Sequence, residues 1–126
     1  MVTAIQHLAL RTEWDAARRA GVYRQSTLGR TLDQVGFIHC SAPHQLAPMA
    51  EFVYADVAEP LCVLTIDRDA VERAGTRVLD EDGGGGETYP HLYGALRIEW
   101  VTRVEPARIE DGRLRVTTDP DGPAFA

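Results

Sequence analysis

The chain has 126 residues, enough for one domain with a single hydrophobic core. Its 44% hydrophobic and 25% charged residues are typical of a soluble globular protein, and its net charge of −6 argues against duplex nucleic acid as the main partner. No apolar run approaches the length of a membrane span. The N-terminus lacks the basic residues followed by an apolar run that a secretion signal has. We therefore expect a cytoplasmic protein with no membrane partner.

The first half of the chain predicts two strands, each followed by a helix. Apolar residues over 4–10 predict the first strand, and Thr12 is a plausible N-cap for a helix that ends at Gly21. Residues 22–32 carry several polar side chains and are expected to form a loop. The run 36–41 predicts the second strand.

A second helix is predicted directly after this strand. Ser41 can cap its N-terminus, and Pro43 suits its first turn, where a missing N–H costs little. Apolar residues then recur at i, i+3, i+4 and i+7 and predict one apolar helical face, made of Leu46, Met49, Ala50 and Val53.

The second half of the chain predicts mostly strands. They are expected over 61–67, 76–79, 95–104 and 113–117, and the first of them should be buried on both faces. Residues 80–88 include four consecutive glycines and are expected to form a mobile loop. No linker interrupts residues 1–118, which we expect to be one domain, and 119–126 are expected to form a flexible tail.

The segment Gly-Phe-Ile-His-Cys-Ser concentrates chemical groups at a strand-to-helix junction. Alternation along a strand places His39 and Ser41 on one face and Ile38 and Cys40 on the other. We expect the first pair to face a cleft and the second pair to face the core. Cys40 is then a buried, reduced thiol rather than a nucleophile, and we expect the same of Cys62.

The segment Tyr-Pro-His-Leu-Tyr-Gly is a second candidate site. Pro90 favours an extended approach to His91, and Gly94 permits a close approach of the backbone. Tyr89 and Tyr93 offer flat rings on which a base or a nicotinamide can stack. The alternative is a loop that aromatic packing holds against the domain.

Other polar residues allow both functional and structural interpretations. His39 and His44 have a spacing seen in zinc sites, but no pair of cysteines or acids completes such a site, so we predict no metal. His7 lies mid-strand, where a histidine is more often structural than a ligand.

Some arginines can either bind a phosphate or simply be solvated, namely Arg11, Arg24 and Arg30. All 13 basic residues are arginine, which excludes a catalytic lysine.

Across most of its length the chain resembles the bacterial domain-of-unknown-function family 952. The segments that carry the resemblance are Ile5-Gln6-His7-Leu8, Trp14, Gly21-Val22-Tyr23, Gly36-Phe37-Ile38-His39-Cys40-Ser41, Gln45, Leu64-Thr65-Ile66-Asp67 and Pro90-His91-Leu92-Tyr93-Gly94. The resemblance implies an ADP-ribosyltransferase-like fold. That fold is a compact α+β domain with two small, mainly antiparallel sheets and a few short helices around an NAD cleft.

The resemblance also implies roles for individual residues. His7 corresponds to the first-strand residue that contacts the NAD ribose, and His39 and Ser41 look like the motif that supports the nicotinamide side. Many members of that superfamily add a late glutamate, for which Glu87 and Glu99 are candidates by location only. The predicted catalytic residues are His7, His39 and His91, and the predicted cofactor-binding residues are Ser41, Gln45, Tyr93, Gly94 and Arg24.

The predicted function is that of an enzyme that binds NAD, or a related nucleotide, and acts at the nicotinamide ribose by ADP-ribosyl transfer or hydrolysis. NAD would be the co-substrate, and the expected partner is a nucleotide or another small anionic ligand, while a protein partner stays open. One alternative is a non-enzymatic module that binds a small ligand or a partner protein in the same cleft. Another is a metal-dependent hydrolase that uses His39, His44 and His91.

Overall fold

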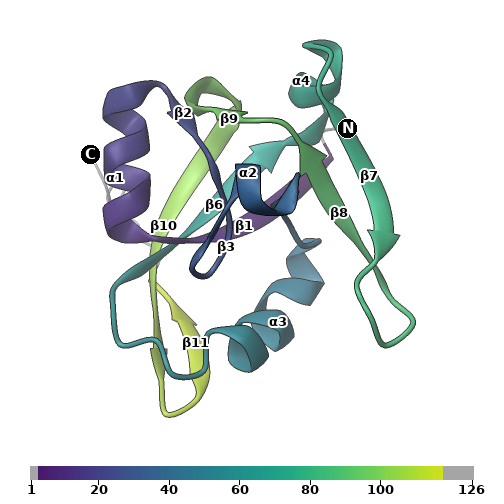
Figure 1. Cartoon of the computed structure of the whole chain (residues 1–126). Helices are drawn as coiled ribbons and strands as arrows, with labels where there is room; N and C mark the ends of the chain where they lie inside the picture. The colour runs from purple at the N-terminus through teal and green to yellow at the C-terminus, as the bar shows by residue number, and fades with distance from the viewer. Residues whose placement is uncertain (1–2, 118–126) are drawn as a thin grey trace.

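The larger sheet has four antiparallel strands in the order β1-β6-β10-β11 (Figure 1). The structure is a computed structural model, and it describes residues 3–117. The strands of this sheet are β1 (Ala4–Leu10), β6 (Leu61–Asp67), β10 (Val101–Glu110) and β11 (Arg113–Val116). β1 is an edge strand, so its outer side is free to meet a second sheet.

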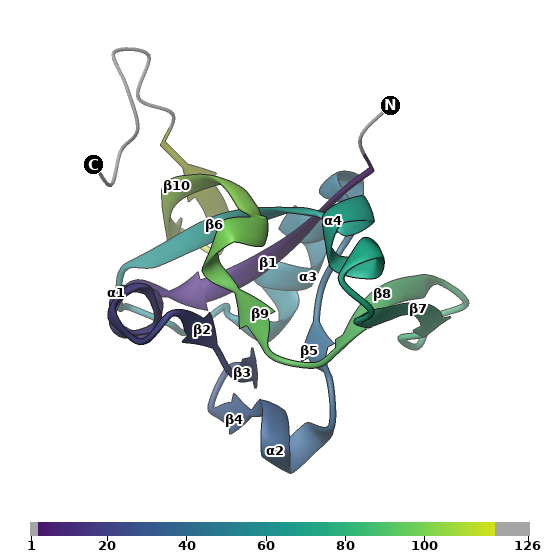
Figure 2. The same ribbon diagram turned by 90° about the horizontal axis from the view of Figure 1, so that it is seen from above.

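A smaller antiparallel sheet in the order β5-β8-β7 lies beside the first (Figure 2). Its strands are β5 (Ile38–His39), β7 (Arg77–Asp82) and β8 (Thr88–Tyr93). A single bridge joins β1 to the segment after β5. The Gln6 N–H donates to the Ser41 carbonyl at 2.8 Å, and the Ser41 N–H donates to the Gln6 carbonyl at 2.7 Å.

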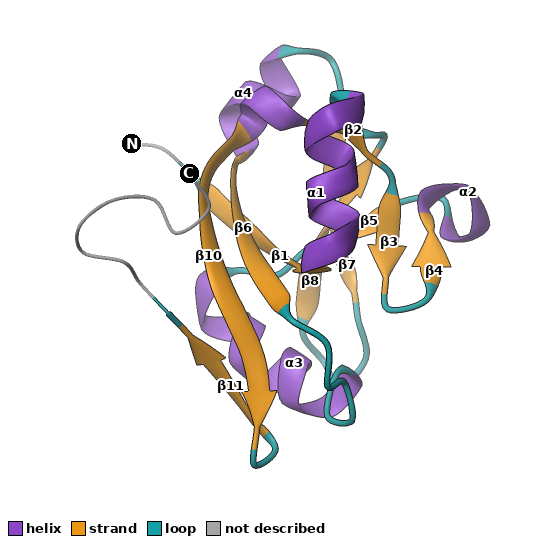
Figure 3. Cartoon of the chain, turned by 90° about the vertical axis from the view of Figure 1, so that its left-hand side faces the viewer, coloured by secondary structure: helices purple, strands orange, loops and turns teal. Residues whose placement is uncertain are grey.

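Two short ribbons complete the antiparallel pairing. One joins β2 (Val22–Tyr23) to β9 (Leu96–Arg97), and the other joins β3 (Gln25–Thr27) to β4 (Arg30–Thr31). Figure 3 shows the β3–β4 ribbon on the side of the molecule away from β10. The prediction of a small α+β domain with antiparallel sheets and a few short helices is therefore confirmed, and the two ribbons add to the two sheets expected.

Two helices cover opposite faces of the larger sheet. The helical segments are α1 (Arg11–Ala20), α2 (Leu32–Val35), α3 (Leu46–Val53) and α4 (Arg68–Arg73), with 3-10 turns η1 (Pro43–Gln45) and η2 (Ile98–Trp100). Trp14 of α1 packs in one core cluster and Leu46 of α3 in another. β6 contributes Leu64 to the first cluster and Val63 to the second, because successive side chains of a strand point to opposite faces. The prediction that this strand is buried on both faces is confirmed.

Two predictions for residues 11–32 need correction. Helix α1 begins at Arg11 with Leu10 at the N-cap and no side-chain cap bond, so Thr12 is not the cap. Residues 22–32 are not a loop, because β2 pairs with β9, which lies some seventy residues further along the chain and leaves no local signal. The end of α1 at Gly21 is confirmed, and its φ of +91° explains why a glycine stands there.

The junction around residue 40 also differs from its prediction. Only Ile38 and His39 of the expected strand 36–41 pair with β8, because Gly36 still belongs to the left-handed end of α2. Ser41 does not cap a helix, since Ala42 holds the N-cap position of η1. Pro43 does occupy the first turn, as predicted.

In the second half of the chain, two predicted segments differ from the observed ones: the loop over 80–88 and the strand over 95–104. Residues 80–82 belong to β7, so the loop expected over 80–88 is shorter. The strand expected over 95–104 is divided into β9, η2 and the start of β10. The predicted tail at 119–126 lies outside the described residues. Within residues 3–117, no helix is long and apolar enough to cross a membrane.

Candidate functional site

A pocket of about 450 Å³ opens where the edge of β1 meets the smaller sheet. Its walls come from β1, β5 and the residues that follow it, α3 and β8, and Gly83 also lines it. Most of the lining side chains are apolar or aromatic, and Met49, Phe52 and Val53 of α3 form one side. This size and this mixture of apolar walls with a few polar groups are typical of small-molecule sites.

The pocket brings together four residues that the sequence analysis selected: His7, His39, Ser41 and His91 all line it. They come from three parts of the chain, and the strand pairing explains why they meet. His39 of β5 is directly opposite His91 of β8, and their ring centroids lie 5.0 Å apart at an interplanar angle of 82°. The Gln6–Ser41 bridge then places β1 beside this pair.

His7 is buried, with 2% of its surface exposed, and both of its ring nitrogens are bonded. Because a carbonyl only accepts, Nδ1 carries the proton and donates to the His39 carbonyl at 2.6 Å. Nε2 therefore accepts from the Tyr23 hydroxyl at 2.8 Å. Burial lowers the pKa of His7 to about 4, so the ring is neutral at pH 7. His7 thus supports the backbone of His39 and offers no spare nitrogen to a ligand.

His91 is also buried, with 4% exposed, but only one of its nitrogens is bonded. Nδ1 lies 2.8 Å from Oε1 of Glu81, and Phe37 stacks on the ring at a centroid distance of 4.0 Å and an angle of 17°. Nε2 is buried and has no hydrogen-bond partner among the described residues. A buried nitrogen without a partner costs about 1–3 kcal/mol, so this atom is a position for a ligand hydroxyl or a water.

His39 is the exposed member of the three. Its ring packs edge-on against Phe37, with centroids 4.8 Å apart, and against His91. Burial of part of the ring lowers the pKa of His39, and the nearby titratable ring of His91 lowers it further. His39 is therefore suited to contact a ligand at the mouth of the pocket as a neutral ring.

The predicted cofactor-binding residues separate into two groups. Ser41 lines the pocket and is 2% exposed. Gln45 is buried and fully engaged with the backbone, because its side chain accepts from the Ala42 N–H and donates to the Thr88 carbonyl, both at 2.9 Å. Gln45 therefore fixes η1 to the start of β8.

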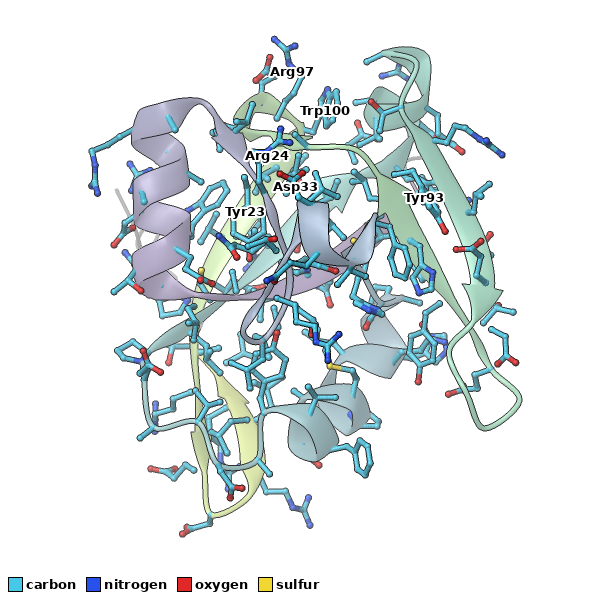
Figure 4. The ribbon with its side chains drawn as sticks, in the orientation of Figure 1. Tyr23, Arg24, Asp33, Tyr93, Arg97 and Trp100 are labelled. Atoms are coloured by element: carbon cyan, nitrogen blue, oxygen red, sulfur yellow. The ribbon has the colours of Figure 1, made fainter. Side chains whose placement is uncertain are left out.

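Like Gln45, the remaining three do not line the pocket. Arg24 is exposed and pairs with Asp33 at 3.2 Å, as the two labelled side chains in Figure 4 show. The Tyr93 hydroxyl donates to Glu81 at 2.6 Å. Gly94 lies against Thr76, where an added Cβ would come within 3.2 Å of the threonine methyl group.

Cys40 and Cys62 are buried, as predicted, and neither forms a disulfide. Burial raises the pKa of each thiol to about 12, so neither provides a thiolate at neutral pH. Over residues 3–117 no three histidine, cysteine, aspartate or glutamate side chains are placed to hold a metal ion together.

Glu81 is the residue of this site that the sequence analysis missed. Glu81 falls within the mobile loop predicted over 80–88, yet it lies in β7 opposite Tyr89, on the same face as His91 two residues along β8. Neither Glu87 nor Glu99 contacts His91: Glu87 accepts from the Tyr89 hydroxyl, and Glu99 pairs with Arg97. Extension of the predicted strand 76–79 by two residues would have placed Glu81 on the same face as Leu79, but only the pairing with β8 brings that face to His91.

Crystal structures of protein CC0527 from Caulobacter crescentus are similar to this chain. The first has a TM-score of 0.76 and 31% sequence identity, over 90% of this chain and 94% of that chain. A double mutant of the same protein has a TM-score of 0.75 and 32% identity at the same coverage. No curated protein matches the chain. The model of the family described as "Protein of unknown function (DUF952)" matches residues 8–104, and the chain therefore belongs to this family.

Proposed function

We propose that this protein is an enzyme that binds NAD, or a related nucleotide, and acts at the nicotinamide ribose by ADP-ribosyl transfer or hydrolysis. The proposal includes an ADP-ribosyltransferase-like interpretation of the fold. One observation carries it: His39 and His91 stand opposite each other on the wall of one pocket, and His91 Nε2 has no partner among the described residues. An acceptor of this kind suits a ligand that brings a hydroxyl group.

The two sides of the pocket suit different parts of such a ligand. The apolar side from α3, together with the ring of Tyr89, suits the flat nicotinamide ring. The histidine side suits the hydroxyl groups of the ribose and the attacking oxygen. In NAD, the bond that would break joins the ribose to the nicotinamide nitrogen, and its cleavage would leave the ribose carbon electron-deficient. The protein then contributes mainly orientation and removal of a proton, and no strong nucleophile is required.

A second candidate is a non-enzymatic module that binds a small ring-bearing ligand in the same pocket. The observation that favours it is the exposure of apolar side chains at the rim, since Phe52 is 87% exposed and Val53 42%. Exposed apolar residues beside a pocket extend the surface on which such a ligand can pack. This candidate predicts saturable binding without turnover.

The test is an NAD⁺ titration followed by measurement of nicotinamide release, with the wild type and His39→Ala side by side. We expect the wild type to release nicotinamide. The kcat/KM of the variant should fall by about tenfold or more, because the lost contact of His39 with the ligand is expected to cost about 1.4 kcal/mol, which corresponds to a factor of ten. The matched control is His44→Ala, which removes an exposed histidine that does not line the pocket. Binding without release would favour the second candidate. The absence of both binding and release would refute the proposed enzyme.

A further inference from the structure

The carboxylate of Glu81 holds two donors on one oxygen. Oε1 lies 2.8 Å from His91 Nδ1 and accepts from the Tyr93 hydroxyl at 2.6 Å. Hydrogen bonds from Tyr93 and then from His91 lower the pKa of Glu81, so it is ionised at neutral pH. An ionised carboxylate only accepts hydrogen bonds, and the proton between Glu81 and His91 must therefore lie on Nδ1.

We propose that Glu81 is a positioning residue, which fixes His91 as the Nδ1–H tautomer and so keeps Nε2 as the proton acceptor of the pocket. The tautomer follows from the contacts of Glu81 and does not depend on the proposed function. Only the reaction in which His91 would take part rests on that function. Two contacts fix the ring: Glu81 bonds Nδ1, and Phe37 stacks on its face at 4.0 Å. A neutral imidazole has one donor and one acceptor, so the first bond determines the role of the other nitrogen.

The chemistry that this arrangement supports is removal of a proton from a hydroxyl group. The O–H bond of water or of an acceptor alcohol breaks, and its proton passes to Nε2. The oxygen bonds to the ribose carbon while the carbon–nitrogen bond breaks, and the electron pair of that bond leaves with the nicotinamide nitrogen. The imidazolium that forms beside the Glu81 carboxylate is stabilised by the opposite charge, in the way that a carboxylate supports histidine in catalytic triads.

Access to Nε2 depends on His39. The nitrogen is buried in the described structure, while the exposed His39 ring stands perpendicular to the His91 ring at 5.0 Å. No hydrogen bond to another described residue holds the His39 ring nitrogens. Rotation of the His39 side chain therefore breaks no hydrogen bond within the described part of the chain, and it would open the side of the His91 ring that His39 covers.

The tautomer of His91 can be measured without any ligand, by side-chain ¹⁵N NMR of the wild type, Glu81→Leu and Glu110→Leu. We expect His91 to be in the Nδ1–H form in the wild type and in Glu110→Leu, which removes an exposed glutamate of β10. Glu81→Leu should convert a substantial fraction to the Nε2–H form while the backbone amide spectrum stays folded. An Nε2–H tautomer in the wild type, or an unchanged tautomer in Glu81→Leu, would overturn the inference.

Nicotinamide release provides the second readout. For a wild type that turns over NAD⁺, Glu81→Leu should lower kcat by about 10–100-fold with little change in KM, the range found when a metal-binding histidine loses its orienting partner. An equal kcat in Glu81→Leu and Glu110→Leu would overturn the positioning role. A wild type that releases no nicotinamide would refute the proposed reaction alone, because the tautomer measurement still decides the role of Glu81.

Discussion

Replacement of His91 by alanine is expected to lower kcat for nicotinamide release by a factor on the order of 10²–10⁴, the range that a positioned general base contributes. The physical reason is that His91 lines the pocket and its buried Nε2 lacks a partner among residues 3–117, whereas both nitrogens of His7 are bonded. KM should change much less, since His39 and the apolar side of the pocket still contact the ligand. Steady-state kinetics on NAD⁺ separates the two parameters.

The variant also removes a ring on which Phe37 stacks, so its folding needs a separate check. Far-UV circular dichroism and thermal unfolding provide this check, and His91→Asn is a second variant that leaves less empty volume. His44→Ala is the control for a histidine outside the pocket, and its kcat should match the wild type. A folded His91→Ala variant with wild-type kcat would show that His91 does not accept the proton.

The stability of the protein is expected to fall by about 3 kcal/mol between pH 6.5 and pH 4, through His7 alone. The pKa of His7 is about 4 in the folded protein, against 6.5 for an unburied histidine. In this pH range the unfolded chain binds a proton at His7 that the folded protein does not, so acid favours unfolding. The contribution is fully present above pH 6.5 and is lost as the pH falls to about 4. Urea unfolding at several pH values measures it.

Carboxylates and other histidines also titrate in acid, and a matched pair of variants isolates His7. His7→Gln keeps a hydrogen-bond donor and an acceptor in β1 without a titrating ring, and it should flatten the decrease between pH 6.5 and 4. His44→Gln changes an exposed histidine and should retain the wild-type decrease. Equal decreases in the wild type and His7→Gln would contradict the buried neutral state of His7.

The elements that could be predicted from the sequence are those with a strong local pattern. The apolar run of β6 and the end of α1 at Gly21 needed no information from distant residues. The strand β2 could not be found in this way. β2 exists because it pairs with β9, and an isolated pair of residues carries no periodicity of its own.

Part of the candidate site could also be predicted from local sequence patterns. Alternation along β5 placed His39 on the pocket side, and the sequence around His91 identified the second wall. The distinction between His7 and His91 depends on Tyr23 and Glu81, which reach the two rings from other elements. The charge of Arg24 alone predicts a phosphate-binding residue, but the fold pairs it with Asp33 outside the pocket.

The most direct test of the account is an NAD⁺ titration of ¹⁵N-labelled protein, followed through the backbone amide shifts. We expect saturable shifts that cluster on the pocket, at His39, Ser41, Met49 and Tyr89. Such a pattern would establish that the pocket formed by β1, β5, α3 and β8 is the nucleotide site. Shifts confined to another surface, such as that of Arg24 and Asp33, or no shifts at all, would contradict it.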